Sequence, residues 1–266
     1  MEFIGSKPVL HQSTITSLLN CGEQYRLGDI VRKRPDLQPY KGLALHYGTA
    51  FHSAIESYFR AQLDEYEISV EDIVAGLRRT WLIPKDGIPV RWDGQPEESL
   101  GSCEKLVRRY LDWYSNQPPI KPALIEQNIR IETEYAWLEG TLDLVLDNGT
   151  IWDWKTAGTY ESFRDVADKG IQSWFYPLLR SGVDIQVAKD IPFVYHGAIK
   201  STYQIYTSLK YAKKEDLEIL LYRMIPNAAK LISQNGPFIP NPLFIWCRSN
   251  MCSVWDMCRG GKIKIE

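Results

Sequence analysis

Residues 126–156 read EQNIRIETEYAWLEGTLDLVLDNGTIWDWKT, and this stretch decides the fold. Along it, β-branched and aromatic residues alternate with polar ones, and Asp147-Asn148-Gly149 separates the runs 138–146 and 150–155. Such alternation is typical of half-buried strands, and such a tripeptide is typical of a hairpin turn. The stretch therefore predicts three consecutive antiparallel strands.

The length of the turn decides which side chains of the hairpin face each other. A two-residue turn would pair Asp143 with Trp154, whereas a three-residue turn with Gly149 in the left-handed conformation pairs Asp143 with Asp153. The second is favoured, because Asp-Asn-Gly suits a type I turn closed by a glycine bulge. One face of the hairpin should then be apolar and the other polar, with Leu142, Leu144, Trp152 and Trp154 on the first and Asp143, Asp153 and Lys155 on the second.

Two carboxylates and an amine on one face raise the question of what offsets their charge. The simplest answer is a solvated strand face with a chance ion pair. The alternative is a divalent cation, and oxygen ligands of this kind suit Mg²⁺ or Mn²⁺.

Four short motifs favour the cation. Gly140-x-x-Asp143 and Asp153-Trp154-Lys155-Thr156 resemble the core of the PD-(D/E)xK nuclease superfamily, in particular its RecB-like exonuclease branch. The segments 48–52 (GTAFH) and 172–176 (QSWFY) resemble two further motifs of that branch and stand in the same order. The resemblance implies an α/β fold, a restriction-endonuclease-like mixed sheet flanked by helices, in one domain over 1–266 with a helical insertion at 64–120.

The resemblance also implies the roles of individual residues. A Mg²⁺ or Mn²⁺ ion would be held by His52, Asp143, Asp153 and the Trp154 carbonyl. The expected catalytic residues are Asp143, Asp153, Lys155, Gln172 and Tyr176. Of these, Lys155 would position the attacking water, Gln172 would orient that water or a ligand, and Tyr176 would contact DNA. His46 lies outside the motif. Glu56 and Glu126 are candidates for a second metal.

The cysteines form a second group of candidate ligands. With no sign of secretion, five cysteines are expected to be ligands or buried thiols, and Cys103 is expected to be a buried thiol. Cys21, Cys247, Cys252 and Cys258 give the count for a 4Fe-4S cluster or a zinc site. One cysteine near the N-terminus and three within 240–266 resemble the cluster of AddB-type and CRISPR-adaptation nucleases, although Cys-x4-Cys-x5-Cys departs from the tighter spacing common there.

Composition bounds the remaining alternatives. A chain of 266 residues with 44% hydrophobic content fits one elaborated domain. A net charge of −2 and a pI near 6.1 exclude a globally basic nucleic-acid binder, so DNA contacts must rest on a local groove. The sequence shows neither an apolar run of about 20 residues nor a signal-peptide pattern, so a cytoplasmic location is expected, in the host if the protein is viral.

The other elements follow from periodicity. A helix capped by Ser13 or Thr14 should bury Ile15, Leu18 and Leu19. The basic segment 31–47 should be exposed, either solvated or in contact with phosphates. Helices are expected at 49–63, 160–180 and 213–234 and as a pair within 70–114, and strands at 191–199 and 202–207.

Together these features predict a metal-dependent DNA exonuclease that degrades single-stranded DNA from its ends and leaves 5′-phosphates. Two alternatives stay open. One is a nuclease subunit active only with a recombination or CRISPR partner, and the other is a non-catalytic DNA-binding protein of the same fold. The resemblance, which extends to phage exonucleases, suggests DNA repair and recombination as contexts.

Overall fold

The predicted hairpin forms the centre of the molecule. The computed structural model describes residues 1–34, 41–82, 88–92, 94–243, 247, 252 and 254–258. In it the three predicted strands are β5 (Pro122–Glu132), β6 (Trp137–Leu146) and β7 (Ile151–Ala157), and each is antiparallel to the next. The first prediction is therefore confirmed.

The turn between β6 and β7 has the predicted three-residue form. Gly149 has a φ of 85°, and its N–H donates to the Leu146 carbonyl over 2.9 Å. The hairpin pairs are Leu144 with Trp152 and Val145 with Ile151. Continuing this register by one residue sets Asp143 opposite Asp153.

β6 organises a mixed seven-stranded sheet in the order β1-β2-β6-β7-β8-β9, with β5 also paired to β6. One edge of β6 pairs with β5 along its length, and the other edge pairs with β2 at 137–138 and with β7 at 144–145. Among the described strands, none pairs with 139–143 on that second edge, which contains Asp143. The remaining strands of the sheet are β1 (Phe3–Ile4), β2 (Lys7–Leu10), β8 (Phe193–Ile199) and β9 (Ile205–Lys210).

β7 and β8 run parallel over seven pairs, so a crossover must connect them. It contains α6 (Tyr160–Lys169), α7 (Gln172–Arg180) and α8 (Ile185–Ala188). The prediction of one helix over 160–180 is wrong, because Gly170 ends α6. A Cβ there would lie 2.5 Å from the Val166 carbonyl oxygen, a contact that only glycine avoids. The break makes Gln172 the first residue of α7.

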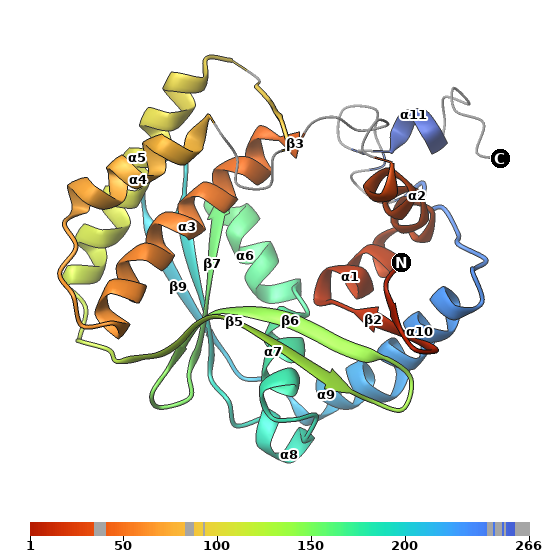
Figure 1. Cartoon of the computed structure of the whole chain (residues 1–266). Coiled ribbons are helices and arrows are strands. Elements are labelled where there is room, and N and C mark those ends of the chain that lie inside the picture. The colour runs from red at the N-terminus through yellow and green to blue at the C-terminus, as the bar shows by residue number, and fades with distance from the viewer. Residues whose placement is uncertain are drawn as a thin grey trace.

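Helices cover both faces of the sheet (Figure 1). α3 (Leu43–Leu63), α4 (Val70–Trp81) and α5 (Pro96–Ser115) pack with Leu144, Trp152 and Trp154 on one face. Leu142 packs in the opposite cluster with Leu10, contrary to prediction. It lies in the part of β6 before Leu144, where the twisted strand is not paired with β7. The opposite face carries α1 (Gln12–Asn20), α6 to α8, α9 (Lys214–Ile219), a π-helical turn (Leu220–Met224) and α10 (Ile225–Ser233).

The two ends of the described chain meet around Cys21. The Asn241 N–H donates to Cys21 Sγ over 3.3 Å, and Asn241 Nδ2 donates to the Asn20 carbonyl over 2.9 Å. The remaining elements are α2 (Gly22–Lys33), α11 (Trp255–Cys258), which contacts α2, and the paired strands β3 (Lys41–Gly42) and β4 (Val90–Arg91).

Three local predictions need correction. α1 begins after His11 rather than after Ser13 or Thr14, and Leu19 is 60% exposed, so α1 buries a narrower face than predicted. α3 begins at Leu43, six residues before the predicted start. The segment 31–47 is not one exposed run, because it contains the end of α2, the buried Lys41 and the start of α3, while 35–40 lie outside the described residues. None of the helices described has the length and apolar character that a membrane span requires.

Candidate active site

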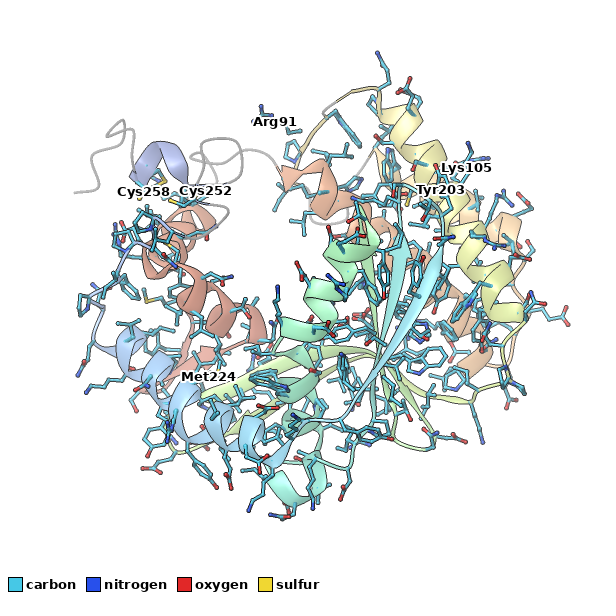
Figure 2. The ribbon with its side chains drawn as sticks, turned by 180° about the vertical axis from the view of Figure 1, so that it is seen from behind. Arg91, Lys105, Tyr203, Met224, Cys252 and Cys258 are labelled. Atoms are coloured by element: carbon cyan, nitrogen blue, oxygen red, sulfur yellow. The ribbon has the colours of Figure 1, made fainter. Side chains whose placement is uncertain are left out.

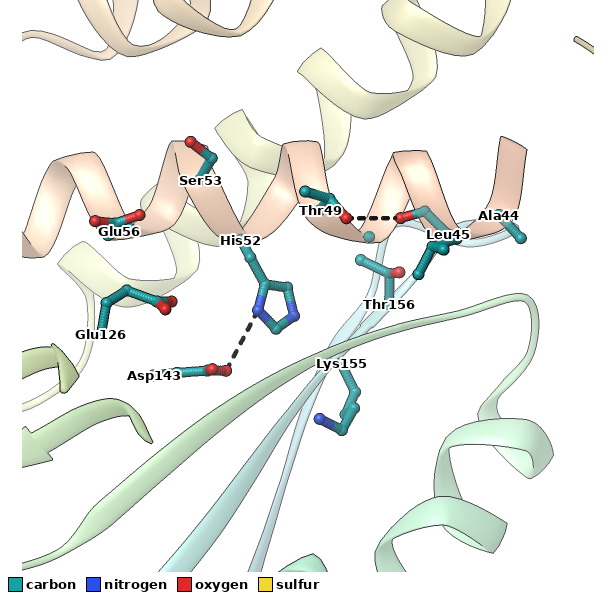
Figure 3. A pocket seen from close by; sticks show the side chains of 11 residues that line it. Ala44, Leu45, Thr49, His52, Ser53, Glu56, Glu126, Asp143, Lys155 and Thr156 are labelled. Carbon is teal, nitrogen blue, oxygen red and sulfur yellow. Dashed lines mark hydrogen bonds and ion pairs between the residues drawn. The ribbon is translucent and has the colours of Figure 1, made fainter. Parts of the chain in front are cut away.

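Asp143 stands where β6 and β7 separate. Its Oδ2 accepts the Trp154 backbone N–H over 2.9 Å and lies 3.3 Å from His52 Nδ1. The backbone of Trp154 also hydrogen-bonds His52. Figure 3 shows the His52 ring pointing from α3 toward Asp143. Groups from α3, β6 and β7 thus meet at the Asp143 carboxylate.

Asp153 and Lys155 lie on the same face of β7, as their spacing of two predicts. Lys155 Nζ is 2.5 Å from Asp153 Oδ2, and Gln172 Nε2 is 3.4 Å from Asp153 Oδ1. Asp153 is only 2% exposed. The crossover after β7 brings Gln172 back to the strand, so all three predicted residues meet.

Burial sets the protonation of this group. Burial, followed by the nearby Lys155 ammonium, lowers the pKa of His52 to about 4, so its imidazole is neutral at pH 7 and keeps a free lone pair. Burial raises the pKa of Asp153 to about 6 against the opposing effect of Lys155, and it also raises the pKa of Asp143. Two carboxylates that are costly to ionise here would be stabilised by a cation between them.

Glu126 faces the same group from β5. The β5–β6 register, which pairs Ile125 with Leu144, sets Glu126 opposite Asp143. Its φ of 48° is uncommon for a residue other than glycine, and such strain is concentrated at functional sites. Burial, then the charges of Asp143 and Glu56, raise the pKa of Glu126 to about 7. Glu56, one turn after His52, pairs with Arg60 over 2.7 Å.

These residues line a cavity of about 520 Å³ that follows one face of α3 (Figure 3). Glu56, Glu126 and Asp143 form its acidic part, whereas Ala44, Leu45, Gly48 and Thr49 near the start of α3 form a mostly apolar part. His52 and Lys155 lie between the two. The predicted site residues that border the cavity are His52, Asp143 and Lys155.

Close packing explains the glycine at residue 140, whereas a Cβ at Gly48 would make an ordinary contact. A Cβ at Gly140 would lie 2.9 Å from Tyr176 Cε1, so the tyrosine ring can cover β6 only if residue 140 is glycine. A Cβ at Gly48 would lie 3.4 Å from Thr156 Oγ1, where α3 approaches β7. Tyr176 also hydrogen-bonds Gln172 through its phenol group. The predicted Gln172–Tyr176 pair therefore acts as one unit against β6 and β7.

A buried polar chain behind the site had no sequence signal. Trp154 Nε1 donates to the Tyr110 hydroxyl over 2.7 Å, and that hydroxyl lies 3.0 Å from His196 Nδ1. Because an indole N–H can only donate, the Tyr110 hydroxyl accepts the bond from Trp154, and the tautomer of His196 decides which of the two groups donates in the second bond. All three residues are at most 2% exposed. The chain fixes the Trp154 ring, whose backbone holds Asp143.

Within the described part of the chain, no three or more His, Cys, Asp or Glu side chains form a ready-made metal site. The donors at the cavity nevertheless fit a Mg²⁺-like ion. Neighbouring ligands of an octahedral ion, each about 2.1 Å from it, lie about 3 Å apart. His52 Nδ1 and Asp143 Oδ2, at 3.3 Å, have nearly that spacing.

The predicted cysteine ligands lie near α2, but within the described residues they do not form a group of three or more that could hold a metal ion. Cys252 and Cys258 pack beside α2 with Leu27 and Val31 (Figure 2). Burial raises the pKa of Cys252, and the neighbouring thiols of Cys247 and Cys21 raise it further. Cys103 is fully buried on α5 away from this group, as predicted.

Comparison with known proteins shows which family and which solved structures the chain resembles. A family model described as "PD-(D/E)XK nuclease superfamily" matches residues 10–259. A crystal structure from Eubacterium rectale, described as a "Putative exonuclease", aligns over 100% of this chain and 96% of that one, with 16% identity and a TM-score of 0.54. A structure described as SSO0001 aligns over 79% of this chain and 97% of that one, with 16% identity and a TM-score of 0.36. No curated protein matches in sequence.

Proposed function

Because the chain belongs to the PD-(D/E)XK nuclease superfamily, whose model matches nearly all of it, we propose that it is a metal-dependent DNA exonuclease. It degrades single-stranded DNA from its ends and leaves 5′-phosphates. The mixed sheet flanked by helices is the restriction-endonuclease-like fold predicted from the sequence. The observation that supports the proposal is the convergence of His52, Asp143, Asp153 and Lys155 where the central strands β6 and β7 separate.

Nucleases of this superfamily generally use Mg²⁺ or Mn²⁺. In this chain His52, Asp143, Asp153 and the Trp154 carbonyl would hold the ion. When bound, it would polarise the scissile phosphate and lower the pKa of a water molecule. The neutral imidazole of His52 and the cost of ionising the two buried carboxylates support this assignment.

The protein's own residues then have distinct tasks. Lys155, held 2.5 Å from Asp153, presents its ammonium group to the attacking water and to the charge that develops on the phosphate. Gln172 fixes the Asp153 carboxylate through Oδ1, and Tyr176 contacts the DNA. The Trp154 N–H keeps Asp143 oriented before substrate arrives.

The cysteine group is proposed to hold a 4Fe-4S cluster, with zinc as the alternative. Cys21, Cys247, Cys252 and Cys258 would bind it, which would join residue 21 and residues 240–266 into one element. Its binding free energy would contribute to folding. The proximity of Cys252 to Cys21 and Cys247 supports this assignment. The element would belong to the single domain 1–266, whose residues 64–120 are a helical insertion.

A cleavage assay tests the proposed function. Linear and circular forms of single-stranded and duplex DNA, labelled at either end, are incubated with the iron-replete protein and Mg²⁺ or Mn²⁺. We expect linear single strands to be degraded, circular DNA to stay intact, and EDTA to stop the reaction. Absence of cleavage by protein with full iron content would contradict a stand-alone exonuclease and favour the partner-dependent or non-catalytic alternative.

Gly140→Ala tests the role of Tyr176. The added Cβ would lie 2.9 Å from the Tyr176 ring and 3.2 Å from Leu179 Cδ2, so we expect the ring to shift and a stability loss of about 1–3 kcal/mol. DNA cleavage should fall by about tenfold, because the displaced Tyr176 ring loses its uncharged contact with the DNA strand. Gly101→Ala is the matched control, because a Cβ at Gly101 meets nothing within 4 Å. Equal activities of the two variants would contradict the role given to Tyr176.

A further inference from the structure

A second cavity lies beside the active site. It has a volume of about 410 Å³ and lies between the first turns of α3 and α5. Tyr47, Glu98, Ser99, Ser102 and Lys200 supply its polar groups. Ala44 borders both this cavity and the active-site cavity, so the two open on neighbouring sides of the start of α3.

The sheet fixes the distance between the two cavities. Lys155 pairs with Gly197 in the parallel β7–β8 ladder, and Lys200 follows directly after β8. The Lys200 N–H donates to the Ala157 carbonyl over 2.8 Å, which anchors it to the end of β7. With about 3.3 Å per residue and about 4.8 Å between strands, the two lysine backbones are about 11 Å apart. Both lysines therefore lie at the same edge of the sheet.

Lys200 is a partly buried cation that forms no ion pair with a carboxylate of the described residues. Its ammonium lies 5.1 Å from the centre of the Tyr47 ring, and no carboxylate of the described residues pairs with it. Glu98 also borders the cavity but forms no ion pair with Lys200. Burial lowers the pKa of Lys200, and the nearby Cys103 thiol opposes this effect. An unpaired charge in such a place is costly unless an anion joins it.

Hydroxyl groups near Lys200 add hydrogen-bond donors to the cavity. Ser102 Oγ lies 3.2 Å from the Tyr47 hydroxyl and 3.4 Å from the Tyr203 hydroxyl. Tyr203 lies next to α5 in Figure 2. In the active-site cavity, by contrast, Lys155 is already paired with Asp153. Lys200 thus offers a strand held at the active site a cation that no carboxylate of the described residues pairs with.

We propose that the cavity around Lys200, Ser102 and Tyr47 binds a phosphate of the substrate strand, a few nucleotides from the bond that is cut. This inference rests on the proposed nuclease function and adds a place where the strand is held outside the catalytic residues. It also accounts for DNA binding by a chain with a net charge of −2.

Salt-dependent binding tests the proposal without cleavage. The affinity of a 12-nucleotide single strand is measured by fluorescence anisotropy in EDTA over a range of salt concentrations. Lys200→Met should weaken binding by about tenfold and reduce the slope of log K against log salt by about 0.7, the value for one lost phosphate contact on a single strand. Lys200→Arg should keep the wild-type slope.

Two controls separate the phosphate contact from other effects. Lys230→Met removes an exposed charge on α10 and should leave affinity and slope unchanged. Lys200→Met should not lower the melting temperature, because Met keeps the aliphatic contact and removes an unpaired charge. If inorganic phosphate binds at Lys200 but the strand shows a wild-type slope in Lys200→Met, the site holds free phosphate only and the proposal fails.

The outcomes distinguish the subsite from the nuclease function. A wild-type slope in Lys200→Met, or no strand binding by the wild type, overturns the subsite. If Lys200-dependent binding is seen but the wild type never cleaves with Mg²⁺ or Mn²⁺, the subsite is supported and the proposed function fails. If the wild type cleaves and Lys200→Met binds normally, only the subsite fails.

Discussion

Asp153→Asn is expected to abolish DNA cleavage while making the metal-free protein more stable at pH 8. The amide keeps the size of the carboxyl group but loses the negative charge that would hold the metal ion. A metal contributes several kcal/mol of transition-state stabilisation, and about 4 kcal/mol corresponds to about a thousandfold in rate. Cleavage of end-labelled single strands should therefore fall by at least about a thousandfold.

The gain in stability follows from the raised pKa of Asp153. Burial raises its folded-state pKa from 3.8 to about 6. A carboxyl group that holds its proton more tightly in the folded state favours folding at low pH, and this contribution is lost as the pH rises from about 4 to about 6. At pH 8 the ionised group therefore opposes folding, by on the order of 3 kcal/mol at most. The amide has no such penalty.

Thermal unfolding in EDTA at pH 4 and pH 8 measures this effect. The melting temperature of Asp153→Asn should exceed that of the wild type at pH 8, and the difference should shrink at pH 4. Asp147→Asn, in the exposed turn of the same hairpin, is the control and should change neither cleavage nor stability. A gain of equal size at both pH values would contradict the raised pKa, and wild-type cleavage would exclude Asp153 from the site.

Gly197→Ala is expected to have the largest effect on the fold. A Cβ at Gly197 would lie 2.5–2.6 Å from three ring atoms of Phe163, a residue that is only 2% exposed. Gly197 pairs with Lys155 across β7 and β8, so the space above it lets α6 pack directly over the catalytic strand. Overpacking of this kind costs about 1–3 kcal/mol. The melting temperature should fall by roughly 3–10 °C.

Two further variants test whether the contact with Phe163 causes the loss of stability. Gly158→Ala should be nearly neutral, because a Cβ there meets nothing within 4 Å and the backbone is not left-handed. Phe163→Leu in the Gly197→Ala background should recover part of the lost stability, since the two residues compete for the same space. If Gly197→Ala and Gly158→Ala unfold at the same temperature, the Phe163 contact does not limit residue 197.

The hairpin and its polar face followed from the sequence because the information there is local. Asp-Asn-Gly fixes the turn, the turn fixes the register, and the register sets Asp143 opposite Asp153. Helices with a strong apolar period could also be predicted. The spacing of Phe51, Ile55 and Phe59 predicts α3 as a helix, although it does not give the residue at which the helix begins. Breaks such as the one at Gly170 depend on a contact that periodicity does not show.

The long-range parts of the site had no comparable signal. Tyr110 and His196 come from α5 and β8, and only the packing of helix on sheet brings their polar groups to Trp154. The strained backbone of Glu126 likewise depends on its position opposite Asp143. The sequence around Lys200 contains no motif that would identify it as a binding residue. Each of these residues is defined by partners from other elements, and sequence patterns do not show those partners.

The parallel pairing of β2 with β6 bears on the order in which the protein assembles during synthesis. Val9 pairs with Trp137, so the N-terminal strand leaves the ribosome long before its partner exists. The meander of β5, β6 and β7 needs only short connections, and closing a long loop has an additional entropic cost. We therefore expect the meander to form first and the N-terminal strand to dock onto it late, as the slow step of folding.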